Sequence, residues 1–179
     1  MSVSSPYALL RELDDLGASG RTPLPTQRSR KALWHCVAFA LGGTRLLTGM
    51  EQITEVVDPP PLIRVPGAKS WLLGVANLRG QLVTVVDLGA LVYGAVSAQP
   101  LRMQRLLVAQ VQGVPVGLVV DRVLGLRRLE KEATPLPEDV RSSALHPYLN
   151  GAYRVDGEPI PFLDVTRLLS SGQLLSAAA

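Results

Sequence analysis

An internal repeat without gaps limits what this chain can fold into. Residues 71–91, WLLGVANLRGQLVTVVDLGAL, align with residues 148–168, YLNGAYRVDGEPIPFLDVTRL. Each copy predicts a strand, a glycine turn, a second strand, an acidic cap and a short helix. The matching positions are Trp71-Leu72, Gly74, Gly80, Asp87 and Leu91 in the first copy and Tyr148-Leu149, Gly151, Gly157, Asp164 and Leu168 in the second. The repeat predicts two similar β subdomains.

A weaker similarity extends the repeat to its opening strands. HCVAFALGG at residues 35–43 resembles RLLVAQVQG at residues 105–113, and both end at a glycine turn. Short runs rich in Val and Leu follow, and no long stretch has apolar residues at the spacing of an amphipathic helix. We therefore expect an all-β fold of two similar five-stranded β-barrel subdomains plus short helices, because closure protects strand edges. The first subdomain should span about residues 45–100 and the second about residues 104–165; an exchange of terminal strands between them stays open.

The two ends of the chain differ from the β region in amino-acid composition and pattern. Residues 6–16, PYALLRELDDL, place their leucines on one stripe of a short amphipathic helix, either docking on a partner or packing on its own domain. Residues 17–31 have linker composition, and the last residues, 171–179, suggest a flexible tail. The expected division is thus residues 1–31, the β domain at residues 32–170, and the tail.

Composition excludes several classes of protein. The chain has 179 residues, of which 47% are apolar, and no apolar run approaches the roughly 20 residues of a membrane-spanning helix. No secretory signal pattern is visible, so we expect a cytoplasmic protein. The net charge of +3 is spread along the chain and only 4% of residues are aromatic, which argues against nucleic-acid binding. The single cysteine, Cys36, cannot form an internal disulfide.

Motifs that carry catalytic chemistry are missing from the sequence. It has no P-loop, GxGxxG, GxSxG, HExxH or CxxC pattern and only two histidines, His35 and His146. We expect no enzyme activity, no cofactor and no metal site. Asp87 and Asp164 each follow a strand and precede a helical turn, so capping is a better interpretation of them than catalysis. Structural turns are expected at Gly74, Gly80, Gly151 and Gly157.

The segment VPGAKSWLLGVANLRGQLVTVVDL, residues 65–88, resembles the signature of CheW-like domains, with Asn77-Leu78-Arg79-Gly80 as its central turn. The resemblance extends over about residues 34–170 and includes HPYLNGAYRVDGEPIPFLDVTRLL. The proline-rich entry, the N-terminal helix and the letters GVAN favour the PilI-like adaptors of type IV pilus signalling. Thr84 stands where the family usually has Pro, and Gly89 where it often has Arg. The second departure puts any partner contact at residue 89 in doubt.

The resemblance implies a non-enzymatic adaptor that couples methyl-accepting chemoreceptors to a CheA-like histidine kinase. In such domains the receptor tip docks in the groove between subdomains, and the kinase's CheW-like regulatory domain pairs barrel to barrel. By this resemblance Glu55 and Arg79 form a polar pair near the groove, beside Asn77 and Leu78, and two apolar residues, Ile53 and Leu107, line it. Flagellar chemotaxis is the alternative pathway. A small-ligand sensor that uses the cleft between the barrels is the alternative function.

Overall fold

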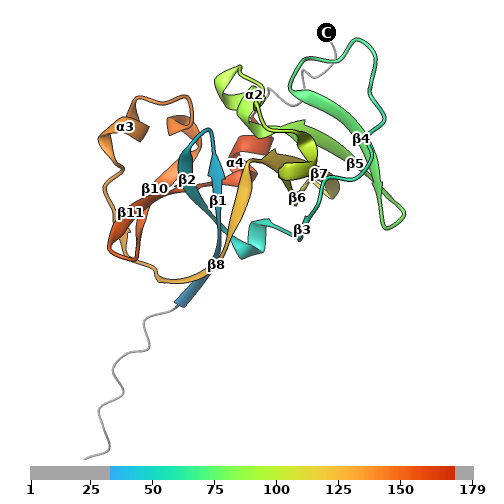
Figure 1. The fold of residues 1–179 in the computed structure, drawn as a ribbon. Coiled ribbons are helices and arrows are strands. Elements are labelled where there is room, and N and C mark those ends of the chain that lie inside the picture. Colours follow the sequence, from blue (N-terminus) through green and yellow to red (C-terminus); the bar gives the residue numbers. More distant parts are fainter. Residues whose placement is uncertain (1–32, 172–179) are drawn as a thin grey trace, which may run out of the picture. The chain divides into compact units, whose positions relative to one another are not determined.

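The computed structural model describes residues 33–171, so the helix and linker expected before residue 32 and the tail after residue 171 lie outside the described residues. The chain divides into two units, residues 1–31 and residues 32–179. The second unit contains two sheets and a few short helices (Figure 1). The strands are β1 Leu33–Leu41, β2 Thr44–Gly49, β3 Glu55–Val57, β4 Leu72–Leu78, β5 Gln81–Asp87, β6 Arg105–Val111, β7 Val114–Val120, β8 Arg122–Glu130, β9 Ala133–Thr134, β10 Leu149–Val155 and β11 Glu158–Leu163. The helices are α2 Leu88–Tyr93, α3 Glu138–Arg141 and α4 Val165–Ser170, with 3-10 turns η1 Met50–Gln52, η2 Leu101–Met103 and η3 His146–Tyr148.

Each sheet closes on itself through one continuous stretch of chain. One sheet has the order β8-β1-β2-β11-β10-β9, and because only Lys131 and Glu132 separate β8 from β9, the same stretch forms both edges. The other has the order β3-β6-β7-β5-β4, and a bridge between Ile63, just after β3, and Val75 of β4 joins its edges. We call these the terminal barrel (β1, β2 and β8–β11) and the central barrel (β3–β7). The all-β, two-barrel prediction is confirmed, with the two-residue β9 as a sixth element of the terminal barrel.

The strands are not divided between the barrels as the sequence repeat suggested. The hairpin β6–β7 lies in the central barrel, where β7 runs parallel to β5, although residues 104–165 were expected to form one subdomain. Conversely, the hairpin β1–β2 pairs with β8 and β11 of the terminal barrel. The two halves of the repeat therefore exchange their opening hairpins. The cause is long-range pairing, since each hairpin finds its edge partner in the other half of the chain.

The repeated residues occupy equivalent places in the two barrels. The backbone N–H of Asp87 donates to the carbonyl of Trp71 at 2.8 Å, and that of Asp164 donates to the carbonyl of Tyr148 at 2.9 Å. Each aspartate is an N-cap: Asp87 Oδ1 accepts from the N–H of Ala90 at 2.9 Å and begins α2, and Asp164 Oδ1 accepts from the N–H of Arg167 at 3.0 Å and begins α4. The structure thus places both carboxylates in caps, where they satisfy N–H groups of the first helical turn.

Four two-residue turns connect the hairpins, and all have positive φ at both positions. These are Gly42-Gly43, Arg79-Gly80, Gln112-Gly113 and Asp156-Gly157. Such turns match the right-handed twist of the strands that they join. Gly74 has a different role: its φ is 143°, and a Cβ there would overlap the carbonyl oxygen of Ile63, so a glycine is needed where the central barrel closes.

Three apolar cores hold the described residues together. The largest lies between the barrels and includes Phe39 and Leu46 from the terminal barrel and Leu107 and Leu118 from the central one, all fully buried. The interior of the terminal barrel contains Trp34 stacked on Phe162, with ring centroids 4.7 Å apart. The interior of the central barrel is aliphatic and rich in valine. Because the barrels share the largest core, residues 33–171 are best regarded as one folding unit.

Candidate functional site

The turn Asn77-Leu78-Arg79-Gly80 forms the tip of the β4–β5 hairpin, which projects from the central barrel (Figure 1). Leu78 pairs with Gln81, so Arg79 and Gly80 are the two turn residues. The side-chain oxygen of Asn77 accepts a hydrogen bond from the N–H of Gly80 at 2.8 Å. Arg79 has a φ of 50°, and 79% of its side chain is exposed. The turn therefore presents a guanidinium at the end of a stiffened hairpin.

Glu55 and Arg79 form an ion pair across the seam of the central barrel, which is the line where its two edge strands, β3 and β4, approach each other. Arg79 Nη2 lies 2.5 Å from Glu55 Oε1, and the two residues come from opposite edges of the sheet. The Glu55 side chain is 22% exposed, and its Oε1 is shielded from water and accepts no hydrogen bond of ordinary geometry within residues 33–171. Because Arg79 is well solvated, the pair should contribute at most about 1 kcal/mol to stability. Its clearest effect is to orient the guanidinium and the hairpin tip.

The other predicted contact residues differ in exposure. Asn77 is exposed, whereas Leu78 and Ile53 are partly buried, Leu78 against the interior of the central barrel and Ile53 against the core between the barrels. Leu107 is fully buried in that same core, opposite Val56 of β3. Leu107 therefore has no surface for a partner in this structure. A strand residue of alternating pattern can face the core or solvent, and only the packing decides which.

Sequence reasoning missed an exposed apolar strip beside this turn. Leu82 of β5 is 67% exposed, Val114 of β7 is 56% exposed, and Val56 of β3 is 40% exposed. Thr84 is opposite Val116 in the parallel pairing, and two residues before each, on the same face, are Leu82 and Val114. Leu82 and Val114 form, with Arg79 of the adjoining turn, what we call the hairpin face, whereas Val56 lies two strands away from Val114, opposite Leu107. Exposed aliphatic residues beside an arginine are typical of protein interfaces.

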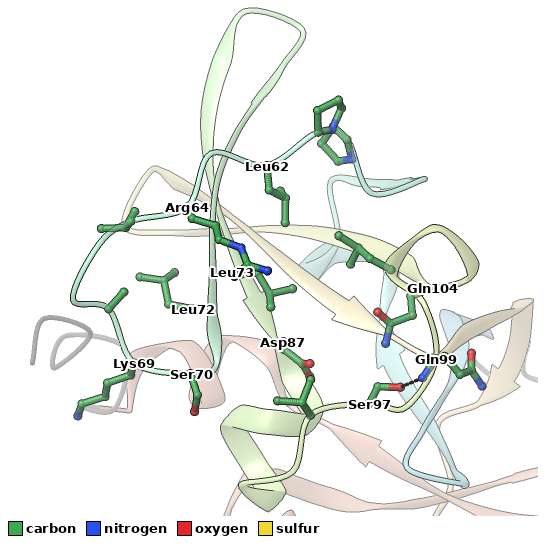
Figure 2. Close-up of a pocket in the computed structure, with 16 residues that line it drawn as sticks. Leu62, Arg64, Lys69, Ser70, Leu72, Leu73, Asp87, Ser97, Gln99 and Gln104 are labelled. Atoms are coloured by element: carbon green, nitrogen blue, oxygen red, sulfur yellow. Dashed lines mark hydrogen bonds between the residues drawn. The ribbon is translucent and has the colours of Figure 1, made fainter.

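A cavity of about 630 Å³ lies at the other end of the central barrel (Figure 2). Leu72, the first residue of β4, and Asp87, the last of β5, line it, so it lies opposite the Arg79 turn. Loops on either side complete its wall, the first carrying Leu62 and Arg64 and the second Ser97, Gln99 and Gln104. It is therefore at the mouth of one barrel, away from the cleft between barrels where a ligand site was considered. The sequence offered one signal, the proline-rich stretch at residues 58–66.

Chemically reactive groups are scarce in the described part of the chain. Among residues 33–171 no group of three or more His, Cys, Asp or Glu residues could hold a metal ion. Burial, followed by the nearby carboxylate of Glu51, raises the pKa of the Cys36 thiol to about 11, so the thiol is protonated at neutral pH. Burial also raises the pKa of Tyr153. Within the same residues, no helix is long and apolar enough to span a bilayer.

Fold and site together define a class: an all-β domain of two barrels that share one core and expose an arginine-bearing apolar face. A comparison with family models matches the CheW-like domain over residues 35–173. Protein PilI of Pseudomonas aeruginosa is 32% identical over 152 residues, 84% of each chain. Chemotaxis protein CheW of Thermotoga maritima is 28% identical over 133 residues, covering 74% of this chain and 85% of that protein.

A solved structure agrees in fold. The scaffolding protein TtCheW from Thermoanaerobacter tengcongensis matches with a TM-score of 0.67 at 20% identity, over 79% of this chain and 95% of that one. The chain belongs to the CheW-like domain family, as the segment around the Asn77-Leu78-Arg79-Gly80 turn predicted. It is a CheW-like adaptor of chemotaxis-type signal transduction, with relatives that include PilI.

Proposed function

We propose that this chain couples methyl-accepting chemoreceptors to a CheA-like histidine kinase, without catalysis of its own, and thereby controls type IV pilus (twitching) motility. Family membership supports the adaptor role, and the similarity to PilI supports the pilus branch. This role would place the chain on the cytoplasmic side of membrane-bound receptor arrays.

One observation carries the proposal for the binding site: the Glu55–Arg79 ion pair holds a solvated guanidinium beside exposed aliphatic side chains. An interface needs such a combination, because aliphatic residues supply area removed from water and a pre-oriented arginine supplies directional hydrogen bonds. Arg79, Glu55 and Asn77 would contact the partner directly, and Leu78 and Ile53 would contribute their exposed edges. Leu107 lies beside Val56 on the same face of the sheet and is fully buried, so it would contribute through the core between the barrels and not by direct contact with the partner.

A second feature supports two partners that bind at once. The chain has two barrels with equivalent aspartate caps, so it can present two comparable faces to a kinase domain of the same fold. The hairpin face occupies only the central barrel. The remaining surface of the terminal barrel would stay accessible when the hairpin face is occupied. An adaptor requires this separation, because a single shared surface would make its partners compete.

The test is affinity purification of the tagged full chain from its native cells, with the wild type beside Arg79→Glu. Arg45→Glu is a matched control, because Arg45 of the terminal barrel is likewise an exposed arginine that pairs with a glutamate, Glu158, and the charge change is the same. We expect the wild type and the control to recover a histidine kinase and a methyl-accepting receptor, and Arg79→Glu to recover less of at least one. Mass spectrometry of the partners would separate the pilus pathway from the flagellar one.

The opposite results are equally clear. Recovery of neither kinase nor receptor by a folded bait would contradict the adaptor proposal. Equal losses with Arg79→Glu and Arg45→Glu would contradict the binding site alone, because the effect would then follow the change of charge and not the position of the guanidinium.

A further inference from the structure

The cavity at the mouth of the central barrel contains buried polar groups that the fold leaves partly unused. Asp87 is 3% exposed and Gln104 is 4% exposed, and both line the cavity. Asp87 Oδ1 accepts the N–H of Ala90, but among the described residues its other oxygen and the Gln104 side-chain amide have no hydrogen-bond partner. Among the described residues the fully buried side-chain polar atom without a partner is Glu55 Oε1, so the free Asp87 oxygen and the Gln104 amide are reached by solvent through the cavity that they line, where a ligand can replace water (Figure 2).

A cation enters the same cavity from the opposite wall. Arg64 belongs to the loop between β3 and β4, and its guanidinium points over Leu73 toward the centre of the cavity (Figure 2). It forms no ion pair within residues 33–171, whereas Arg45, Arg79 and Arg105 all do. A negative group deep on one side and a positive group at the rim of the other give the cavity two poles.

Between the two poles the surface is apolar. Leu62 and Leu73 form part of the lining and pack against the interior core of the central barrel. Leu72 packs against the core between the barrels and adds to the same lining. These three leucines belong to the folded framework, so the apolar surface is present before any ligand arrives. Little free energy is therefore spent on ordering this surface when a ligand binds, which favours binding.

From this arrangement we propose that the cavity binds a short peptide of two or three residues with a free α-ammonium, a free carboxylate and apolar side chains. The ammonium would donate to the unused Asp87 oxygen, the carboxylate would pair with Arg64, and the Gln104 amide would hydrogen-bond the peptide group. The apolar side chains would cover the leucines. A volume of about 630 Å³ is within the range of small-molecule sites and exceeds the needs of one amino acid.

The site is independent of the adaptor role, because it lies at the end of the barrel opposite Arg79 and shares no residue with the hairpin face. Failure of the peptide to bind would leave the adaptor proposal intact. If the affinity purification recovers no kinase or receptor, the proposal of a peptide site is unaffected, because calorimetry with a peptide tests it separately.

Titration calorimetry of the full chain with the dipeptide Leu-Leu tests the proposal. We expect saturable binding that weakens about tenfold or more when the ammonium is acetylated, and similarly when the carboxylate is amidated. Altering the ligand avoids mutating Asp87, whose capping bond the fold needs. Arg64→Ala should weaken binding of Leu-Leu about tenfold, while Arg128→Ala, at an exposed arginine of β8 in the terminal barrel, should leave it unchanged.

Two outcomes would overturn the proposal. The first is no measurable heat with Leu-Leu up to about 10 mM, a concentration at which even a weak specific site is largely filled. The second is binding that Arg64→Ala and both capped dipeptides leave unchanged, because the ligand would then be bound elsewhere. Gln104→Leu provides a second variant of similar volume, and it should weaken Leu-Leu binding without lowering the melting temperature, since it removes only unpaired polar atoms.

Discussion

Arg79 Nη2 lies 2.5 Å from Glu55 Oε1, and the contact joins the two edge strands of the central barrel at the end where no backbone bridge closes them. At the other end of the seam, Ile63 and Val75 exchange two backbone hydrogen bonds of 2.8 and 2.9 Å. The seam is thus closed by backbone at one point and by side chains at another. Side-chain closure leaves the guanidinium exposed, so the same contact can serve both the fold and a partner.

Arg79→Glu should change stability little. The arginine side chain is 79% exposed, so losing its ion pair should cost no more than about 1 kcal/mol. For a domain of this size, about 1 kcal/mol is a shift of roughly 2–4 °C in melting temperature. Thermal melting followed by circular dichroism measures this shift. Collapse of the variant would show that Arg79 is primarily a structural residue.

Leu82→Glu should weaken recovery of the kinase or receptor while leaving the fold intact. Leu82 is 67% exposed on the hairpin face, so a charge there stays in water in the free protein and becomes costly only when a partner covers it. Leu126→Glu is a matched control at a 62% exposed leucine of β8. Pull-down yields normalised to folded bait measure the effect. If both variants lose the partner equally, the hairpin face has no special role.

The two N-caps should differ in their contribution to stability. Asp87→Ala should cost about 2 kcal/mol, because the carboxylate is 3% exposed, and Asp164→Ala about 1 kcal/mol at a more solvated site. Urea denaturation of the two variants gives both values. Asp→Asn at each position keeps an acceptor and should recover part of the loss. Equal costs at both positions would mean that burial does not affect the strength of the cap.

Gln112→Asn should stabilise the chain by roughly 0.5 kcal/mol. Gln112 has a φ of 50° in a two-residue turn followed by Gly113, and Asn-Gly is a strongly preferred pair for such turns. Gln110→Asn, in the neighbouring strand β6, is the control and should be neutral or destabilising, because Asn is disfavoured in strands. Chemical denaturation compares the two. A loss of stability in Gln112→Asn would indicate that Gln112 makes a contact that outweighs the turn preference.

The Cys36 thiol should be unreactive in the folded chain. Its pKa is raised from an ordinary value of 9.0 to about 11, chiefly by burial, and the side chain is fully inaccessible. Because the folded state holds this proton more tightly, the associated stability is present below pH 9 and is lost as pH rises from about 9 through 11. Thiol titration at pH 8, with and without denaturant, tests the reactivity. Rapid reaction of the folded chain would show that the site opens easily.

Much of the fold could be predicted from the repeat. The glycine turns, the aspartate caps and the strands depend on residues close in sequence, so they could be recognised in both copies of the repeat. The division into subdomains was different. Residues 104–165 look like one unit along the chain, yet β6–β7 joins the central barrel and β1–β2 the terminal barrel. Which hairpin completes which sheet depends on partners far apart in sequence.

The candidate site, like the fold, was predictable from the sequence only in part. Family resemblance indicated Glu55 and Arg79, and their ion pair is present in the structure. Leu107 looked equally suitable from its strand pattern but is fully buried, whereas Leu82, in a similar pattern, is exposed. Alternation identifies the two faces of a strand but cannot tell which part of a face another barrel will cover.

The sequence by itself determined the local features of this protein, namely its turns, its caps, its strands and its family. These features arise from backbone preferences and hydrogen bonds between near neighbours, so they are written in short stretches of residues. Tertiary structure alone decided the hairpin exchange, the two closures of the seam and the cavity that brings Arg64, Asp87 and Gln104 together. Those depend on how distant segments share one core, because burial of apolar surface is a property of the whole packed chain.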